Sequence, residues 1–189
     1  MSHTNQPAAL LIIDYTNDFV APNGALTLGE PAQAAEPAII NIAQRFWETG
    51  QLVILPTDLH HAHDPYHPES KLFAPHNLAG SWGRQFYGEL EPWYEAHRAE
   101  PTVWEMPKTR YSAFAGTDLD LQLRARGITE LHLTGVATDI CLLHTAVSAY
   151  NLGYQLVIHP HATASFSPEN QAFALQHFQT ALGAQLIND

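Results

Sequence analysis

The chain has 189 residues, 46% of them apolar, and its eight Lys and Arg against 19 Asp and Glu give a formal net charge of −11. Without a basic run, nucleic acid and an anionic membrane surface are disfavoured as partners. No apolar run approaches the roughly 20 residues of a membrane span, and the first residues lack the pattern of a secretory signal. The length and the absence of repeats or linkers predict one domain, residues 1–189. The single cysteine excludes an intramolecular disulfide, so we expect the protein in the cytoplasm. The negative balance also fits a bound cation.

In chain order, apolar runs long enough for buried strands alternate with segments of helical spacing. Strands are expected at 8–13, 51–56, 102–106, 130–136, 154–159 and 184–187, and helices at 31–49, 88–97, 119–126, 140–152 and from 167 to a stop at 183. Residues 15–29 are expected to form a loop. This alternation predicts a parallel sheet with helices on both faces. The fold class is therefore α/β, a single three-layer α/β/α domain around a six-stranded, mostly parallel sheet.

The segment 58–101 has little periodicity, and a loop of this length in a compact domain is usually functional. Five histidines gather in it, at positions 60, 61, 63, 67 and 76. Asp58 and His60, followed by Glu69 and His76, offer imidazoles and carboxylates that suit Zn²⁺, Fe²⁺ or Mn²⁺. The spacing matches no zinc finger, and the other three histidines equally well read as solvated loop residues.

The only cysteine, Cys141, follows an apolar strand and a small-residue turn, at the expected start of a helix. Unpaired backbone N–H groups and the helix dipole should lower the pKa of a thiol there and favour the reactive thiolate. Thr138 or Asp139 could cap this helix. The alternative is a buried core cysteine with no chemical role.

Three groups follow three expected strands and should meet at one edge of the sheet, where ligands bind in open α/β folds. These groups are Asp14, Lys108 and Cys141. A carboxylate can accept the thiol proton, an ammonium can stabilise the thiolate, and the sulfur can attack a carbonyl. Taken singly, Asp14 also fits a turn and Lys108 a solvated surface.

Aromatic residues lie in the loops that flank these groups, and flat apolar walls would suit an aromatic substrate. They are Phe19, Phe73, Trp82, Tyr111 and Phe114. Ordinary loop packing is the alternative for each.

Two sets of motifs resemble a known family and its metal-dependent branch. Residues 11–19 (LIIDYTNDF), Lys108 and residues 135–141 (GVATDIC) resemble the opening strand, lysine and nucleophile turn of the isochorismatase-like cysteine hydrolases. Residues 57–60 (TDLH) and 73–83 (FAPHNLAGSWG) resemble the metal motif of nicotinamidases. Residues 67–71 (HPESK) are similar to a bacterial subgroup in which a glutamate joins the metal shell. The likeness spans nearly the whole chain; Asn77, where many nicotinamidases have a second cysteine, and Ala74, where a proline is frequent, depart from it.

The resemblance implies hydrolysis of nicotinamide to nicotinate and ammonia in NAD salvage, with pyrazinamide also accepted. It makes Asp14, Lys108 and Cys141 catalytic, and makes Asp58, His60, His76 and Glu69 ligands of a divalent metal, with Zn²⁺ expected first and Fe²⁺ or Mn²⁺ as alternatives. It implies a cis peptide between Val136 and Ala137, with the N–H groups of Ala137 and Cys141 as the oxyanion hole. Phe19, Phe73 and Tyr111 would bind the ring.

The expected mechanism is attack by the Cys141 thiolate, with Asp14 as base, to give a thioester that water hydrolyses, while the metal holds the pyridine nitrogen. Another cysteine amidohydrolase of the same superfamily, acting on a carbamoyl or ureido group, is the nearest alternative. Isochorismatase itself does not need the cysteine. A metal-dependent hydrolase with a structural Cys141 and a non-enzymatic binding protein also remain. A homo-oligomer stays open.

Overall fold

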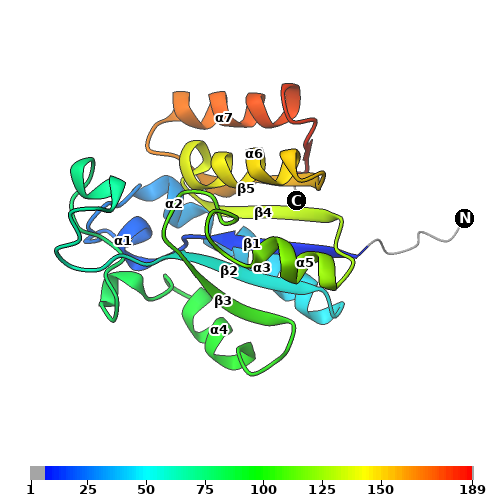
Figure 1. Ribbon diagram of the computed structural model, residues 1–189, viewed down its shortest axis with the longest axis horizontal. Coiled ribbons are helices and arrows are strands. Elements are labelled where there is room, and N and C mark those ends of the chain that lie inside the picture. Colours follow the sequence, from blue (N-terminus) through cyan, green and yellow to red (C-terminus); the bar gives the residue numbers. More distant parts are fainter. Residues whose placement is uncertain (1–6, 189) are drawn as a thin grey trace, which may run out of the picture.

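A six-stranded sheet with every pairing parallel forms the centre of the computed structural model, which describes residues 7–188 (Figure 1). The strands are β1 (Ala8–Ile13), β2 (Leu52–Asp58), β3 (Val103–Lys108), β4 (Glu130–Val136), β5 (Gln155–Ala164) and β6 (Gln185–Leu186). Their order is β3-β2-β1-β4-β5-β6. The α/β class is confirmed, and the sheet is wholly rather than mostly parallel.

The chain builds this sheet outward from β1 in two directions, first to β2 and β3 and then, after crossing back, to β4, β5 and β6. The reversal places a switch point between β1 and β4, where open α/β sheets bind ligands beyond the carboxyl ends of the strands. β1 is apolar and fully buried, which explains why its sequence reads as a continuous apolar run, and β4 buries five of its seven residues.

Helices cover both faces of the sheet, as expected. They are α1 (Asn17–Val20), α2 (Glu30–Ala34), α3 (Glu36–Glu48), α4 (Leu90–His97), α5 (Leu119–Ala125), α6 (Leu143–Asn151) and α7 (Pro168–Thr180). One core packs α3 and α4 against the sheet, and the opposite core packs α5, α6 and α7. Among the described residues, no helix is long and apolar enough to cross a membrane.

Two boundaries differ from the prediction for local reasons. The single helix expected at 31–49 is two helices, α2 and α3, each of which begins with a proline in its first turn. Pro37 has no N–H to continue the first helix, so a second one starts there. The loop expected at 15–29 also contains the short helix α1, whose four residues are all buried.

The long segment between β2 and α4 has little regular structure beyond two 3₁₀ turns, η1 (Pro68–Lys71) and η2 (Trp82–Arg84). It returns on itself, because His60 N–H donates to the carbonyl of Asn77 at 3.1 Å and Ala79 N–H donates to the carbonyl of His60 at 2.9 Å. Figure 1 shows this segment gathered at the carboxyl end of β1 and β2. It therefore forms one wall of the switch point.

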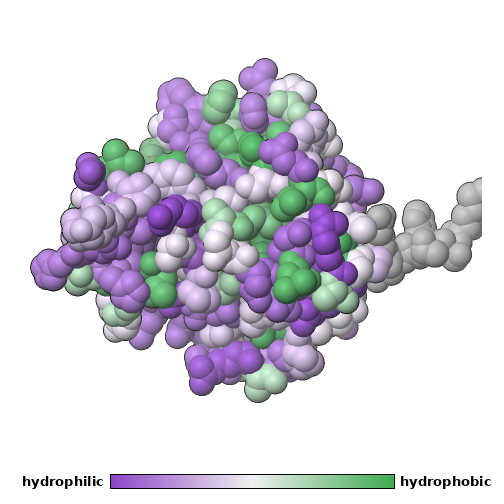
Figure 2. All heavy atoms as spheres, viewed as in Figure 1, coloured by the Kyte–Doolittle hydropathy of each residue, from purple (hydrophilic) through white to green (hydrophobic). Residues whose placement is uncertain are grey.

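Hydrophilic and hydrophobic residues are interspersed on the face of the molecule drawn in Figure 2. Large apolar side chains that remain exposed include Tyr66, Leu72, Phe166 and Phe173.

Candidate active site and metal centre

The turn after β4 carries Cys141 to the switch point. Gly135 has a φ of 102°, and a Cβ at this position would lie 2.0 Å from the carbonyl oxygen of Ile13 on β1. Only glycine fits this close approach of the two strands. The next peptide bond, Val136–Ala137, is cis, as the resemblance implied.

Cys141 lies in a π-helical turn, Thr138–Leu142, which runs into α6. The helix expected here therefore begins with a π-helical turn, which is wider than an α-helical turn. Neither Thr138 nor Asp139 caps it. The thiol is 4% exposed, so it is reached only from the cavity that it lines.

Asp14 and Lys108 meet beside this thiol and are fully buried with it. The ammonium of Lys108 lies 2.7 Å from Asp14 Oδ2 and 3.7 Å from Cys141 Sγ. It also forms a short ion pair with Asp58 Oδ1. Asp14, at the end of β1, has a φ of 54°, and its Oδ1 accepts the N–H of Asp58 at 2.8 Å. The structure thus brings the three groups from three strand ends into one cluster.

The electrostatics of this cluster differ from the expectation for Cys141. Burial raises the pKa of the Cys141 thiol well above its usual value; Lys108 opposes this rise, and the carboxylates of Asp14 and Asp58 add to it. The helix dipole therefore does not produce a resting thiolate. Burial and Asp58 also raise the pKa of Asp14 to about 6, while Lys108 opposes them. A thiol that keeps its proton next to a carboxylate needs that carboxylate as its base.

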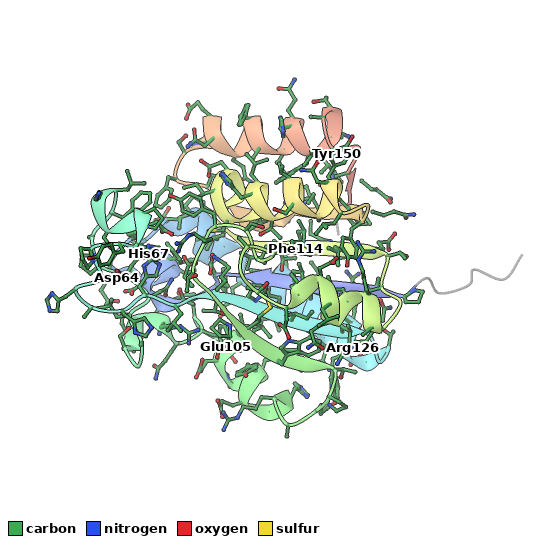
Figure 3. The ribbon with its side chains drawn as sticks, viewed as in Figure 1. Asp64, His67, Glu105, Phe114, Arg126 and Tyr150 are labelled. Carbon is green, nitrogen blue, oxygen red and sulfur yellow. The ribbon has the colours of Figure 1, made fainter. Side chains whose placement is uncertain are left out.

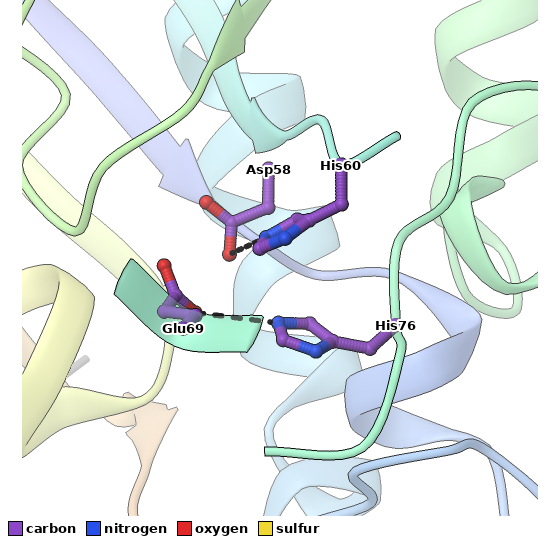
Figure 4. Close-up of side chains that lie close together, drawn as sticks. All are labelled: Asp58, His60, Glu69 and His76. Carbon is purple, nitrogen blue, oxygen red and sulfur yellow. Dashed lines mark ion pairs between the residues drawn. The ribbon is translucent and has the colours of Figure 1, made fainter. Parts of the chain in front are cut away.

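Four further side chains converge next to this cluster (Figure 4). Asp58, His60, Glu69 and His76 each present one ligand atom, and these four atoms lie within 4.8 Å of one another. All four residues are buried, with exposed fractions between 1% and 8%. Asp58 comes from the end of β2, Glu69 from η1, and the histidines from the loop segments on either side. The sequence-predicted metal ligands thus lie together.

The hydrogen bonding of His76 tests whether a cation fits this group. Its Nδ1 lies 2.8 Å from the carbonyl oxygen of Ala74, which can only accept, so Nδ1 carries the ring proton. In the neutral ring, Nε2 then presents a lone pair to Glu69 Oε2 at 3.4 Å. Two lone pairs that face each other in a buried place repel unless a cation lies between them. Asp58 Oδ2 and His60 Nε2 are also buried without a hydrogen-bond partner. The donor set therefore fits a divalent metal ion.

The possible ligand atoms of Asp14, Asp58 and Cys141 also lie within 4.8 Å of one another. The ammonium of Lys108 lies among these atoms, in contact with both carboxylates and with the sulfur. Its charge fills the role of a cation there, so this group reads as a proton-transfer cluster rather than as a second metal site.

One narrow cavity joins the two groups. Phe19, Phe73 and Tyr111 line it together with Cys141 and His76. The ring centroid of Phe19 lies 5.3 Å from that of His76. The three aromatic residues expected to face a substrate ring thus line the cavity onto which Cys141 and His76 open.

Two other aromatic residues singled out from the sequence do not line this cavity. Phe114 packs against Tyr154, with ring centroids 5.8 Å apart, over the middle of the sheet (Figure 3). Trp82 is 48% exposed. Sequence reasoning missed three apolar residues that do line the cavity, namely Leu26, Ile140 and Phe166. Ile140 lies next to Cys141 within the motif at 135–141, whereas Leu26 and Phe166 come from parts of the chain with no motif, and only the folded arrangement brings them there.

Comparison with known proteins agrees with this arrangement. Residues 8–188 match the isochorismatase domain. A Bacillus subtilis (strain 168) protein described as an uncharacterized isochorismatase family protein, PncA, is 56% identical over 178 residues, which are 94% of this chain and 97% of that protein. The solved structure of nicotinamidase/pyrazinamidase PncA from Bacillus subtilis has a TM-score of 0.96 at 55% identity, over 97% of this chain and 100% of that one. Pyrazinamidase of Pyrococcus horikoshii, solved in complex with zinc, has a TM-score of 0.84 at 25% identity, over 97% and 99%.

Proposed function

The chain belongs to the isochorismatase family, and from this premise we propose that it is a nicotinamidase, which hydrolyses nicotinamide to nicotinate and ammonia. One observation carries the proposal: the thiol with its buried base, and three of the four residues of the metal group, line the same cavity between aromatic walls. A pyridine ring that carries a carboxamide needs both ends of such a cavity. The Bacillus subtilis relatives support the same activity, and pyrazinamide, with a ring of similar shape, is a second expected substrate.

The chain's own residues supply the covalent chemistry. Asp14 takes the proton of the Cys141 thiol, and the sulfur attacks the amide carbon. The N–H groups of Ala137 and Cys141 receive the oxyanion, a contact whose loss typically costs about 10²–10³-fold in rate. Protonated Asp14 gives its proton to the departing nitrogen, which leaves as ammonia.

A water molecule then hydrolyses the thioester, with Asp14 again as its base, and releases nicotinate and the thiol. Throughout the cycle Lys108 keeps the Asp14 carboxylate and the sulfur together, since its ammonium contacts both.

Asp58, His60, Glu69 and His76 would hold the metal ion. When bound, the cation would supply a Lewis acid for the pyridine nitrogen, and the ring so oriented would present its carboxamide to the thiol. We propose Zn²⁺, because two imidazoles and two carboxylates suit it and because the Pyrococcus horikoshii relative was solved with zinc. The reactive thiol suits the reducing cytoplasm, which we propose as the compartment, with NAD salvage as the pathway.

The alternative amidohydrolase, acting on a carbamoyl or ureido group, is less well supported. Such substrates have no ring nitrogen to orient, so the four buried metal ligands and the aromatic walls would have no purpose. The buried thiol beside Asp14 and Lys108 also argues against a metal-dependent hydrolase in which Cys141 is merely structural.

A panel of amides tests the proposal. Ammonia release is measured with nicotinamide, pyrazinamide, benzamide and an N-carbamoyl amino acid, and the metal content is determined on the same sample. We expect rapid release from the first two. Benzamide, which has the shape of nicotinamide without its ring nitrogen, should be a poor substrate. Preferred hydrolysis of the carbamoyl compound would overturn the proposal.

A further inference from the structure

His67 stands apart from the other histidines of the loop that do not belong to the metal group. It is 7% exposed, whereas His61 and His63 are exposed. Figure 3 shows it at the carboxyl end of the sheet, beside Asp64. A buried imidazole here is not the solvated loop residue that the sequence allowed.

Both ring nitrogens of His67 have partners. Nδ1 accepts the backbone N–H of Glu69 at 3.2 Å, and Nε2 lies 2.8 Å from the carbonyl oxygen of Thr109. A backbone N–H can only donate and a carbonyl can only accept. The proton therefore sits on Nε2, and neither nitrogen is free to ligate a metal.

These two contacts reach the two halves of the site. Through Nδ1, His67 caps η1, the turn that carries the metal ligand Glu69. Through Nε2–H, it holds the backbone of Thr109, the residue that follows Lys108. Its ring also packs on that of His60, with centroids 4.3 Å apart. The hydrogen bonds of His67 thus join the η1 turn of the metal group to the backbone that follows β3.

We propose that His67 is a positioning residue that couples the metal group to the thiol cluster, one nitrogen fixing Glu69 and the other fixing the backbone beside Lys108. The inference rests on the proposed function and deepens it. It states that one side chain, His67, keeps the metal ligands that orient the substrate ring at a fixed distance from the thiol cluster that attacks the amide. Partners that orient metal ligands typically change metal affinity or activity by about 10–100-fold when removed.

Three variants separate the two contacts. His67→Asn keeps an oxygen that can cap η1, as asparagine commonly does, but is too short to reach Thr109. His67→Gln places an amide N–H near the position of Nε2 but is a poor cap. His67→Ala loses both contacts. His61→Ala, an exposed histidine of the same loop, is the matched control.

The first measurement is the dissociation constant for Zn²⁺, from competition with a chromophoric chelator. We expect His67→Asn to stay within about threefold of the unchanged protein, and His67→Gln and His67→Ala to bind Zn²⁺ about 10–100-fold more weakly. The second measurement is kcat with nicotinamide at saturating Zn²⁺. Here we expect the reverse pattern, with His67→Gln near the unchanged value and His67→Asn reduced about tenfold or more. Thermal unfolding of the metal-free variants shows that each is folded.

A merely structural histidine would move both quantities together in the two amide variants, and that parallel loss would overturn the inference. Unchanged Zn²⁺ affinity in His67→Ala would also overturn it. If the unchanged protein fails to hydrolyse nicotinamide, the proposed function fails instead, and the Zn²⁺ series still decides whether His67 positions Glu69.

Discussion

Replacing Lys108 with methionine removes the one positive charge in the thiol cluster at little change in side-chain shape. The ammonium lies 3.7 Å from Cys141 Sγ. At an effective dielectric constant of about 20, this distance corresponds to an attraction of about 4 kcal/mol for a thiolate, or about 10³-fold in rate as an upper bound. Burial removes water from both charges, and part of the attraction only offsets the free energy lost in that way. We therefore expect kcat/KM of Lys108→Met to fall by about 10²–10³-fold.

The same substitution should move the pH dependence in a defined direction. Asp14 acts as a base only when ionised, and its pKa is raised to about 6, so activity of the unchanged enzyme should fall as the pH drops through about 6. Lys108 lowers this pKa, whereas burial and Asp58 raise it. Without the ammonium the pKa rises further, so the acid limb of the kcat/KM profile should move to higher pH.

The assay is nicotinate formation across pH for the unchanged enzyme, Lys108→Met and Lys71→Met. Lys71 is an exposed lysine in η1 and serves as the matched control. Metal content is determined at each pH, because Lys108 also contacts Asp58, one of the proposed metal ligands. A loss below tenfold with an unmoved acid limb, at unchanged metal content, would refute the reasoning.

Three further predictions follow from the site and its turn. Loss of a residue that only orients a metal ligand typically weakens metal binding by roughly 10–100-fold, and His76→Ala, which removes a proposed ligand itself, should weaken Zn²⁺ binding by more than that in a chelator competition. The same variant should raise the KM for nicotinamide in steady-state kinetics. Phe19→Leu should raise that KM by about 2- to 12-fold through the lost ring contact, whereas Phe114→Leu, outside the cavity, should leave it unchanged; equal effects would contradict the cavity assignment. Gly135→Ala should lower the free energy of unfolding in urea by about 3–5 kcal/mol, because the new Cβ meets Ile13 O at 2.0 Å; a change below 1 kcal/mol would be too small for that clash.

The central strands β1 and β2 could be predicted from the sequence because they are fully buried and begin as apolar runs. Asp14, Lys108 and Cys141 could be placed at one edge because parallel strands bring their carboxyl ends together. The parallel pairing of the short last strand, β6, could not be read from its sequence, since two residues carry no orientation signal.

The pKa of Cys141 could not be predicted from local structure. A helix start alone lowers the pKa of a thiol, but burial and the two carboxylates from β1 and β2 raise it here, and their distances exist only in the fold. The burial of His67 was hidden for a similar reason. Its two partners are backbone groups of residues 69 and 109, and a backbone partner leaves no mark on the sequence.

Nicotinate production by Cys141→Ala, loaded with Zn²⁺ to the content of the unchanged enzyme, addresses the covalent role of the sulfur most directly. Cys141 is not one of the four proposed metal ligands, Asp58, His60, Glu69 and His76, so the variant should bind the ion normally. If the sulfur forms the bond to the amide carbon, turnover should fall by at least about 10⁴-fold. Turnover within tenfold of the unchanged enzyme would instead assign the hydrolysis to the metal centre and leave the thiol without a covalent part in it.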